Sequence, residues 1–339
     1  MSKLDLESIE NASNNIADVI VPTALEYNNR LSELYGAKIY LKREDLQITR
    51  SYKIRGAYNF ISSLNQNQKN KGIVTASAGN HAQGVAFSAN KLKVKAIIFM
   101  PINTQPQKIN RVKTLGGKFI EIRLVGENFD ESNDKALEES SKTGTIFVPP
   151  FDDELIIAGQ GTVGKEIYKE LGDSVDMIIC PVGGGGLIAG VSLYFSQKES
   201  DTEIIGVEPV GADAMQQSIR HNRIVTLNKI DTFVDGVAVK TVGSKSFDIV
   251  SKLVKKILLV PVGKICLTMI ELYQEDGIIT EPAGALSVSA LDSIAKDIKN
   301  KLVVCIISGG NNDLMRYPEI IEKAKQYTDY STTENVSLF

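Results

Sequence analysis

Short apolar runs rich in β-branched residues alternate along the chain with longer segments whose apolar residues recur at helical spacing. The runs that predict strands are 38–42 (KIYLK), 72–77 (GIVTAS), 94–100 (VKAIIFM), 118–124 (KFIEIRL), 145–149 (TIFVP), 176–182 (DMIICPV), 203–208 (EIIGVE), 257–261 (ILLVP) and 301–307 (KLVVCII). The segments that predict helices are 58–64, 81–92, 130–143, about 161–171, 187–195, 264–277 and about 283–296. Such alternation is typical of βαβ units, so we predict a doubly wound α/β protein with a mostly parallel sheet.

Composition bounds the class of protein. A chain of 339 residues with 43% hydrophobic and 23% charged residues predicts one large or two medium globular domains. The formal net charge of −3, with basic residues scattered along the chain, gives no electrostatic footprint for nucleic acid. We therefore expect no nucleic-acid partner.

The compartment is predicted from what the sequence contains. The first twenty residues are polar and acid-rich, and no apolar run approaches the roughly 18 to 20 residues that span a bilayer. Cys180, Cys266 and Cys305 are far apart, and Cys180 and Cys305 lie in apolar strand-like runs, which indicates buried free thiols. We expect a cytoplasmic protein without a membrane partner.

In α/β sheets, ligands bind beyond the carboxyl ends of the strands. Four places on this sequence fit that rule: Lys53 in RSYKIRGAYN, the segment SAGNHAQG from Ser77, the segment GGGGL from Gly183 to Leu187, and SGGNND from Ser308. These four segments are the candidate site.

The glycine run from Gly183 to Gly186 stands between a predicted strand and a predicted helix, where backbone N–H groups and the helix dipole favour an anion. A phosphate-bearing cofactor is one interpretation. Gly184, Gly186 and Ala189 also satisfy the G-x-G-x-x-A pattern, with Glu208 where a ribose-binding acid would stand, so a dinucleotide is a second interpretation. A tight structural turn is the third.

Several motifs occur in one order: KREDLQ, SYKIRGAYN, SAGNHAQGVA, GGGGL, EPAGAL and SGGN. In this order, from about Pro22 to Arg316, the chain resembles the β-family of pyridoxal-phosphate enzymes, called fold type II, and within it the biosynthetic threonine dehydratases. The resemblance implies two three-layer αβα domains with mostly parallel sheets, like the tryptophan synthase β-subunit. It implies a large cofactor domain of residues 1–70 and 149–325, a small domain of residues 71–148, and a polar tail of residues 326–339.

The resemblance also implies the roles of the site residues. Lys53 would form a Schiff base with the aldehyde of pyridoxal 5'-phosphate, and the loop Gly183, Gly184, Gly185, Gly186 and Leu187 would hold its phosphate. Asn80 would bond the ring hydroxyl, and Ser308 would contact the pyridine nitrogen. The substrate carboxylate would bind at Ser77, Ala78, Gly79, Asn80 and His81, while Glu281 would either orient the cofactor or be structural.

Residue chemistry is consistent with this assignment. A lysine amine with a reference pKa near 10.4 reacts at neutral pH only where burial or nearby positive charge lowers that pKa, as a cofactor cleft would. Ser308 presents a neutral hydroxyl, so the ring would be a weaker electron sink than one paired with a carboxylate, which suits β-elimination. His81 is a less favoured catalytic base than Lys53, and we expect His221 at the surface.

Two departures separate this chain from similar families. Serine racemase-like members carry a second serine where this chain has Ala78, and its hydroxyl acts on the opposite face of Cα, so racemisation should be poor. Those members also bind a divalent cation through an acidic segment, where this chain has Glu208 and Asp213 but Ala214 in place of an aspartate. We expect no metal there, with Asp213 capping a helix instead.

The resemblance implies a lyase that converts L-threonine to 2-oxobutanoate and ammonia, with L-serine giving pyruvate as a secondary reaction, in isoleucine biosynthesis or threonine degradation. A serine racemase/dehydratase or a β-replacement enzyme is the alternative. A homodimer or homotetramer is implied as well. Only 23 residues follow Arg316, enough for a helix and a polar tail, so we expect no isoleucine-sensing domain and no isoleucine feedback.

Overall fold

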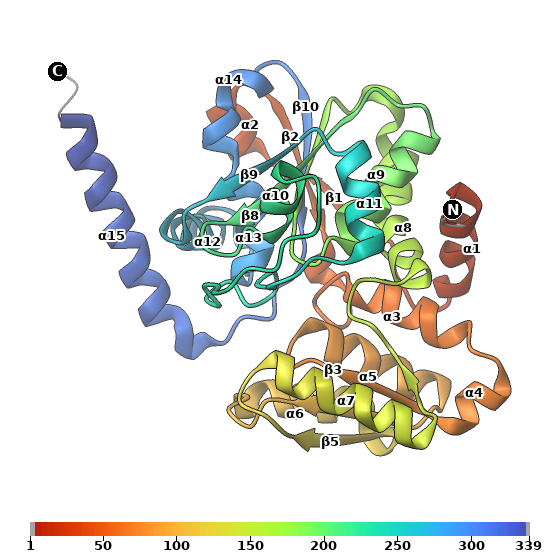
Figure 1. Cartoon of the computed structure of the whole chain (residues 1–339). Helices are drawn as coiled ribbons and strands as arrows, with labels where there is room; N and C mark the ends of the chain where they lie inside the picture. Colours follow the sequence, from red (N-terminus) through yellow and green to blue (C-terminus); the bar gives the residue numbers. More distant parts are fainter. Residues whose placement is uncertain (1–3, 337–339) are drawn as a thin grey trace.

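The computed structural model describes residues 4–336 of the chain, with side-chain surroundings given through residue 328. Two sheets organise these residues (Figure 1). The first has six strands in the order β1 (Leu25–Tyr27), β2 (Lys38–Arg43), β10 (Leu302–Ile307), β7 (Met177–Pro181), β8 (Glu203–Pro209) and β9 (Lys256–Val260). The second has four strands in the order β5 (Ile120–Leu124), β4 (Ala96–Met100), β3 (Ile73–Ala76) and β6 (Ile146–Phe147).

All neighbouring strands are parallel except β1, which pairs antiparallel with β2. The last strand, β10, lies between β2 and β7, with Val304 opposite Tyr40 on one side and Ile178 on the other. The chain therefore starts in the six-stranded sheet, builds the four-stranded sheet, and returns to complete the first.

Helices cover both faces of each sheet. The longer ones are α1 (Leu6–Ile16), α3 (Lys53–Ser62), α5 (Asn80–Leu92), α6 (Pro106–Gly116), α7 (Phe129–Thr143), α8 (Glu154–Leu171), α9 (Gly186–Gln197), α11 (Ser244–Leu253), α12 (Val262–Asp276), α13 (Pro282–Ser289) and α15 (Tyr317–Val336). The shorter ones are α2 (Asn29–Tyr35), α4 (Gln66–Lys71), α10 (Ala214–Arg220) and α14 (Ala295–Ile298).

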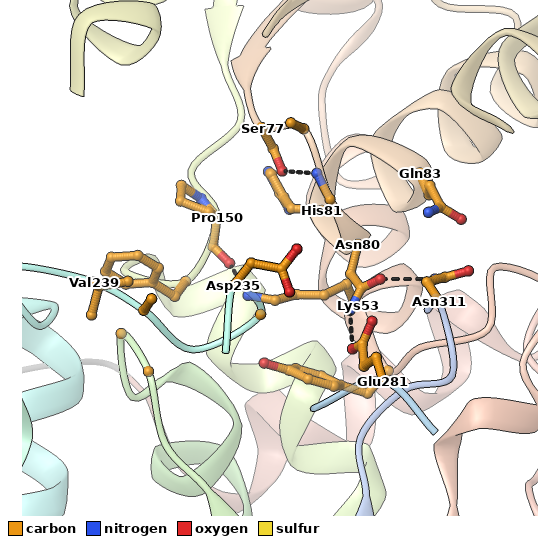
Figure 2. A pocket seen from close by; sticks show the side chains of 18 of the residues that line it. Lys53, Ser77, Asn80, His81, Gln83, Pro150, Asp235, Val239, Glu281 and Asn311 are labelled. Carbon is orange, nitrogen blue, oxygen red and sulfur yellow. Dashed lines mark hydrogen bonds between the residues drawn. The ribbon is translucent and has the colours of Figure 1, made fainter. Parts of the chain in front are cut away.

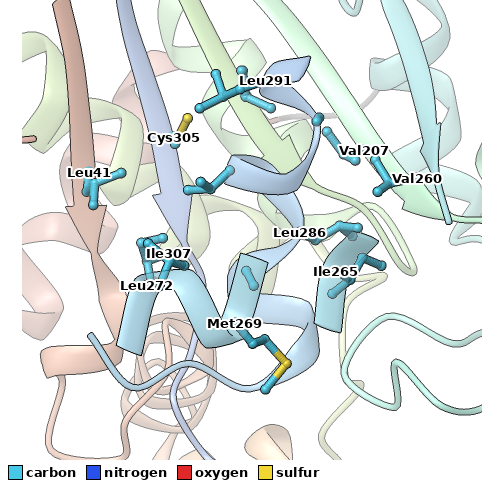
Figure 3. Close-up of a cluster of buried hydrophobic side chains, with 14 of the residues drawn as sticks. Leu41, Val207, Val260, Ile265, Met269, Leu272, Leu286, Leu291, Cys305 and Ile307 are labelled. Atoms are coloured by element: carbon cyan, nitrogen blue, oxygen red, sulfur yellow. The ribbon is translucent and has the colours of Figure 1, made fainter. Parts of the chain in front are cut away.

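The side-chain alternation of the strands separates the layers. In β10, Val303, Cys305 and Ile307 join the cluster beneath α12 and α13 (Figure 3), whereas Val304 and Ile306 join the cluster beneath α8 and α9. A strand with apolar residues on both faces reads as one continuous apolar run, as KLVVCII does. The predicted fold class, αβα layers on mostly parallel sheets, is confirmed.

Three helix predictions were wrong in their bounds. Helix α3 covers Lys53–Ser62, whereas the prediction was 58–64. Helix α8 begins at Glu154, where the carboxylate of Asp153 accepts a hydrogen bond from the Leu155 N–H, and not near residue 161. The helix predicted over about 283–296 ends at Ser289, and a 3₁₀ turn (Leu291–Ile294) separates it from α14.

The cysteine prediction is confirmed, because Cys180, Cys266 and Cys305 are all buried and free. His221 is exposed, as predicted. The segment predicted as a polar tail is helical as far as Val336, and its residues 337–339 lie outside the described part. The division into a large domain of residues 1–70 and 149–325 and a small domain of residues 71–148 stays a prediction.

Candidate active site

A cavity of about 400 Å³ lies between the two sheets, beyond the carboxyl ends of their strands. Its volume is in the range of small-molecule sites. Four groups of residues line it: Tyr52 and Lys53; Ser77 to His81; Gly183 to Leu187; and residues from the intervening loops, among them Pro150, Phe151, Asp235, Glu281 and Asn311. The structure thus brings together segments that are far apart in sequence.

Lys53 is the first residue of α3, and its position is set by the two residues before it. Ser51 forms a bridge with Gly309, and the Tyr52 N–H donates to the Ser308 carbonyl at 3.2 Å, so the chain is held against the end of β10. The Lys53 Nζ donates to the Pro150 carbonyl at 2.8 Å inside the cavity (Figure 2). Burial lowers the pKa of Lys53 to about 8, although Glu281 opposes the shift. A substantial neutral fraction of the amine is therefore present near pH 8.

The glycine run connects β7 to the N-terminus of α9, and neighbouring atoms leave no room for side chains. A Cβ on Gly184 would lie 2.3 Å from Cγ of Phe151, and one on Gly183 would lie 2.8 Å from Cα of Val237. Gly185 has φ of +95°, which other residues rarely adopt. The first N–H groups of α9 have no acceptor within their own helix, so this loop offers donors at a positive helix end.

The segment after β3 forms a second helix N-terminus at the cavity. Ser77 Oγ accepts a hydrogen bond from the Gly79 N–H at 3.1 Å, and Gly79 precedes the thirteen-residue helix α5 without a side-chain cap. Ala78 contributes only a methyl group to the cavity lining. The uncapped N–H groups suit a carboxylate.

His81 is buried, and its ring contacts a carbonyl. The distance from His81 Nε2 to the Val148 oxygen is 3.1 Å, so Nε2 carries the proton, and the buried Nδ1 has no hydrogen-bond partner. Burial, together with the positive charge of Lys53, lowers the pKa of His81 to about 3. A neutral imidazole of such low basicity is a poor general base at neutral pH, whereas its Nδ1 can accept a hydrogen bond.

Asn80, the first residue of α5, is bonded on both sides. Its Nδ2 donates to Glu281 Oε1 at 2.6 Å, and its Oδ1 accepts from Asn311 Nδ2 at 2.8 Å (Figure 2). Burial raises the pKa of Glu281 to about 7, and Asp235 adds to that shift. Asp235 pairs with Lys108 of α6 at 2.6 Å across the mouth of the cavity.

Ser308 stands directly after β10 but does not border the cavity, unlike the other predicted site residues. Its buried Oγ donates to the Ala283 carbonyl at 3.1 Å. Because the Ser308 carbonyl accepts from the Tyr52 N–H, the residue lies just behind Lys53.

Glu208, the acid of the dinucleotide interpretation, lies against the start of α10 and outside the cavity. Its buried carboxylate accepts from the N–H groups of Met215 and Gln216, both at 2.9 Å, and burial raises its pKa to about 8. It is engaged by backbone and does not line the cavity, which argues against the dinucleotide interpretation. The predicted cap was wrong: Glu208, and not Asp213, caps α10, because Asp213 makes no side-chain cap bond.

Sequence reasoning missed the cavity residues that belong to irregular loops. Pro150 and Phe151 follow the two-residue strand β6, and Asp235 lies between α10 and α11, where no periodic pattern marks a strand end. Asn311 lies in the segment SGGNND, but no role is predicted for it from the sequence. A signal for it exists, because Asn311, like Ser308, follows β10.

Comparisons with known proteins agree on one family. The family described as "Pyridoxal-phosphate dependent enzyme" matches residues 16–309. The chain is 48% identical over 327 residues to a biosynthetic L-threonine dehydratase (IlvA) of Halalkalibacterium halodurans, covering 96% of this chain and 79% of that one. It is 49% identical to the protein of that name from Lactococcus lactis, with the same coverage.

Solved structures are similar throughout the chain. The processed form of threonine deaminase isoform 2 from Solanum lycopersicum has a TM-score of 0.90 and 41% identity, covering 94% of this chain and 88% of that one. Maize serine racemase has a TM-score of 0.88 and 30% identity, covering 97% and 100%.

Proposed function

Because the chain belongs to the family of pyridoxal-phosphate dependent enzymes, we propose that its cavity binds pyridoxal phosphate and that the protein deaminates L-threonine to 2-oxobutanoate and ammonia. The assignment of L-threonine as the substrate rests on the high identity to biosynthetic L-threonine dehydratases over nearly the whole chain. That name favours a role in isoleucine biosynthesis. L-Serine, giving pyruvate, is the expected secondary substrate.

The residues of the cavity fit this cofactor. The Lys53 amine with its lowered pKa is available to an aldehyde, and the glycine loop at the positive end of α9 suits a phosphate. The buried Nδ1 of His81 has no partner, so the cavity holds an acceptor for a polar ligand. When bound, pyridoxal phosphate supplies an electrophilic aldehyde carbon and a conjugated ring that accepts electrons from Cα.

The chain's own groups then have distinct tasks. Lys53 Nζ would remove the proton from Cα of the substrate, because this amine lines the cavity and is partly neutral near pH 8. The N–H groups at the start of α5 would hold the substrate carboxylate, and Asn80 would donate a hydrogen bond to the ring oxygen of bound pyridoxal phosphate. The β-hydroxyl takes up a proton and leaves as water, and a second water molecule hydrolyses the resulting enamine to ammonia and the 2-oxo acid.

Serine racemisation is the second candidate, because maize serine racemase shares the fold at 30% identity. Ala78 counts against it. Ala78 lines the cavity, but its side chain has no hydroxyl that could exchange a proton on the opposite face of Cα. An assay for D-serine formed from L-serine separates the two functions.

The test combines spectroscopy with turnover. The purified protein should absorb visible light, borohydride should fix the cofactor on Lys53 in a peptide map, and L-threonine should yield 2-oxobutanoate. Lys53→Ala should abolish turnover, whereas Lys91→Ala, at an exposed position of α5, should retain it. A colourless protein with no 2-oxo acid product would refute the proposal.

Assembly and compartment complete the proposal. Within residues 4–336 no helix is long and apolar enough to cross a bilayer. We propose a homodimer or homotetramer, which sedimentation analysis would test, and a cytoplasmic location, which the buried free thiols support because reducing compartments preserve them.

A further inference from the structure

Three side chains from three separate elements meet at the cavity floor: Glu281, the residue before α13; Asn80, the first residue of α5; and Asn311, in the loop after β10 (Figure 2). Asn80 Nδ2 donates to Glu281 Oε1 at 2.6 Å, and Asn80 Oδ1 accepts from Asn311 Nδ2 at 2.8 Å. Asn311 Nδ2 also donates to the Thr49 carbonyl at 2.8 Å. These three residues form the amide clamp.

The clamp defines which way the Asn80 amide faces. If the amide were flipped, its oxygen would face the carboxylate of Glu281 and its nitrogen would face the nitrogen of Asn311, so both hydrogen bonds would be lost. The observed orientation uses one N–H of Asn80 on Glu281 and leaves the second N–H for the cavity that Asn80 lines.

We propose that Glu281 is a positioning residue that, with Asn311, holds the Asn80 amide with a hydrogen-bond donor turned toward the ring oxygen of bound pyridoxal phosphate. The proposal rests on the proposed function and adds a residue to its machinery. Glu281 acts through Asn80 and takes no proton from the substrate.

Packing keeps Glu281 in place. It is 5% exposed, and its backbone N–H donates to the Gly309 carbonyl at 3.2 Å. A Cβ on Gly309 would lie 2.5 Å from Glu281 Oε1, so the carboxylate rests directly on the Gly309 backbone. The Gly309 backbone therefore blocks one side of the carboxylate, and the hydrogen bond from Asn80 holds it at the cavity.

The clamp fully favours the observed orientation of the Asn80 amide over the flipped one only while Glu281 is ionised. A protonated Glu281 carboxyl can also donate a hydrogen bond to the oxygen of a flipped amide. Burial and Asp235 raise the pKa of Glu281 to about 7, against the opposing effects of Asn80, Lys108 and the Asn311 backbone. Lys53 and Tyr52 are the other titratable groups whose pKa values respond to Glu281. Since the carboxylate form prevails above about pH 7, the orientation should weaken as pH falls through that value.

The test compares wild type with Glu281→Gln, which keeps the side-chain shape but can either donate or accept. Pyridoxal phosphate affinity and the visible absorption maximum are measured from pH 6 to 8.5. Dividing the wild-type affinity by the variant affinity at each pH removes the effect of groups that titrate in both proteins. At pH 8 the variant should bind about tenfold more weakly, as for one charge-assisted hydrogen bond, and the ratio should fall toward one below pH 7.

Glu208→Gln is the matched control, because Glu208 is also buried with a raised pKa but lies outside the cavity. It should keep the wild-type pH profile and absorption maximum. The clamp would be overturned if Glu281→Gln, folded by circular dichroism, bound pyridoxal phosphate as tightly as wild type and the ratio of the two affinities did not change with pH. Failure of the proposed function is distinguishable, because wild type itself would then show neither the visible band nor 2-oxo acid release.

Discussion

Replacing Arg55 by methionine should destabilise the protein by about 3–5 kcal/mol, because it leaves a buried carboxylate without its cation. Arg55 is in α3, two residues after Lys53, and it is fully buried. Its guanidinium donates to Glu44 at 2.7 and 2.8 Å, to Glu166 at 2.6 and 2.9 Å, and to Thr162 at 3.0 Å. Lys42, at 2.6 Å from Glu166, completes the network.

The magnitude follows from what the substitution leaves behind. Glu166 keeps Lys42 as a partner and is 16% exposed, whereas Glu44 is 0% exposed and would retain only the Thr23 hydroxyl at 2.6 Å and a weak contact from Gln47 at 3.5 Å. Methionine fills most of the volume of the arginine stem, so the loss is mainly electrostatic. The expected loss is a large part of a total stability of about 5–15 kcal/mol.

The assay is urea unfolding of wild type, Arg55→Met, and the double variant Arg55→Met with Glu44→Gln. The double variant removes the uncompensated charge and should recover part of the lost free energy of unfolding. A loss below about 1 kcal/mol in the single variant, or a double variant no more stable than the single, would refute the reasoning.

The change of the free energy of unfolding with pH tests the same network independently. Burial raises the pKa of Glu44, but Arg55, Lys42 and Thr23 outweigh burial and leave the pKa lowered. The stability from this carboxylate is therefore fully present above its unfolded pKa of about 4.3 and is lost as pH falls through the lower folded value. Arg55→Met should consequently lose less stability than wild type on acidification below about pH 4.3.

Three further outcomes are expected. Gly184→Ala should weaken pyridoxal phosphate binding at least about tenfold in an absorbance titration, since its Cβ would lie 2.3 Å from the Phe151 ring and displace the loop; unchanged affinity would contradict this. In cofactor-free protein, the rate at which an acylating reagent modifies Lys53 should reach half its maximum near pH 8, because the neutral amine reacts; a midpoint near the ordinary value of about 10.4 would show that burial has no such effect. Asp152→Ala should cost about 1–2 kcal/mol in urea unfolding, because the carboxylate accepts from the N–H groups of Ser244, Lys245 and Ser246 at the start of α11, and an unaltered midpoint would count against that cap.

The strands could be predicted because their apolar residues face two helical layers. Each of the nine predicted runs overlaps a strand of the structure, whereas β1, only three residues long, was not predicted. The start of α8 was missed because Gly159 lies just before the predicted start at Gly161, and both glycines lower helix propensity there. Packing explains these glycines: a Cβ on Gly159 would lie 2.6 Å from Cα of Gly56, and one on Gly161 would lie 3.0 Å from the Gly190 carbonyl. Close approach to α3 and α9 thus outweighs local propensity in α8.

Site residues could be predicted where they end a strand or carry a motif. Lys53, the Ser77 to His81 segment and the glycine run do so, and all line one cavity. Asp235 and Pro150 stand in irregular loops, so their place depends on how the two sheets meet, which no local pattern encodes. The Arg55 network was missed for the same reason, since its members look like ordinary surface charges until the tertiary structure buries them.

Two contacts across the cavity differ in burial: the hydrogen bond between Asn80 and Glu281, and the ion pair between Lys108 and Asp235. At the floor, Asn80 is bonded to the buried Glu281, an arrangement that solvent and salt screen little. At the mouth, Lys108 and Asp235 are 22% and 39% exposed, so their ion pair contributes about 0–1 kcal/mol. Breaking the exposed ion pair between Lys108 and Asp235 therefore costs far less free energy than breaking the buried hydrogen bond between Asn80 and Glu281.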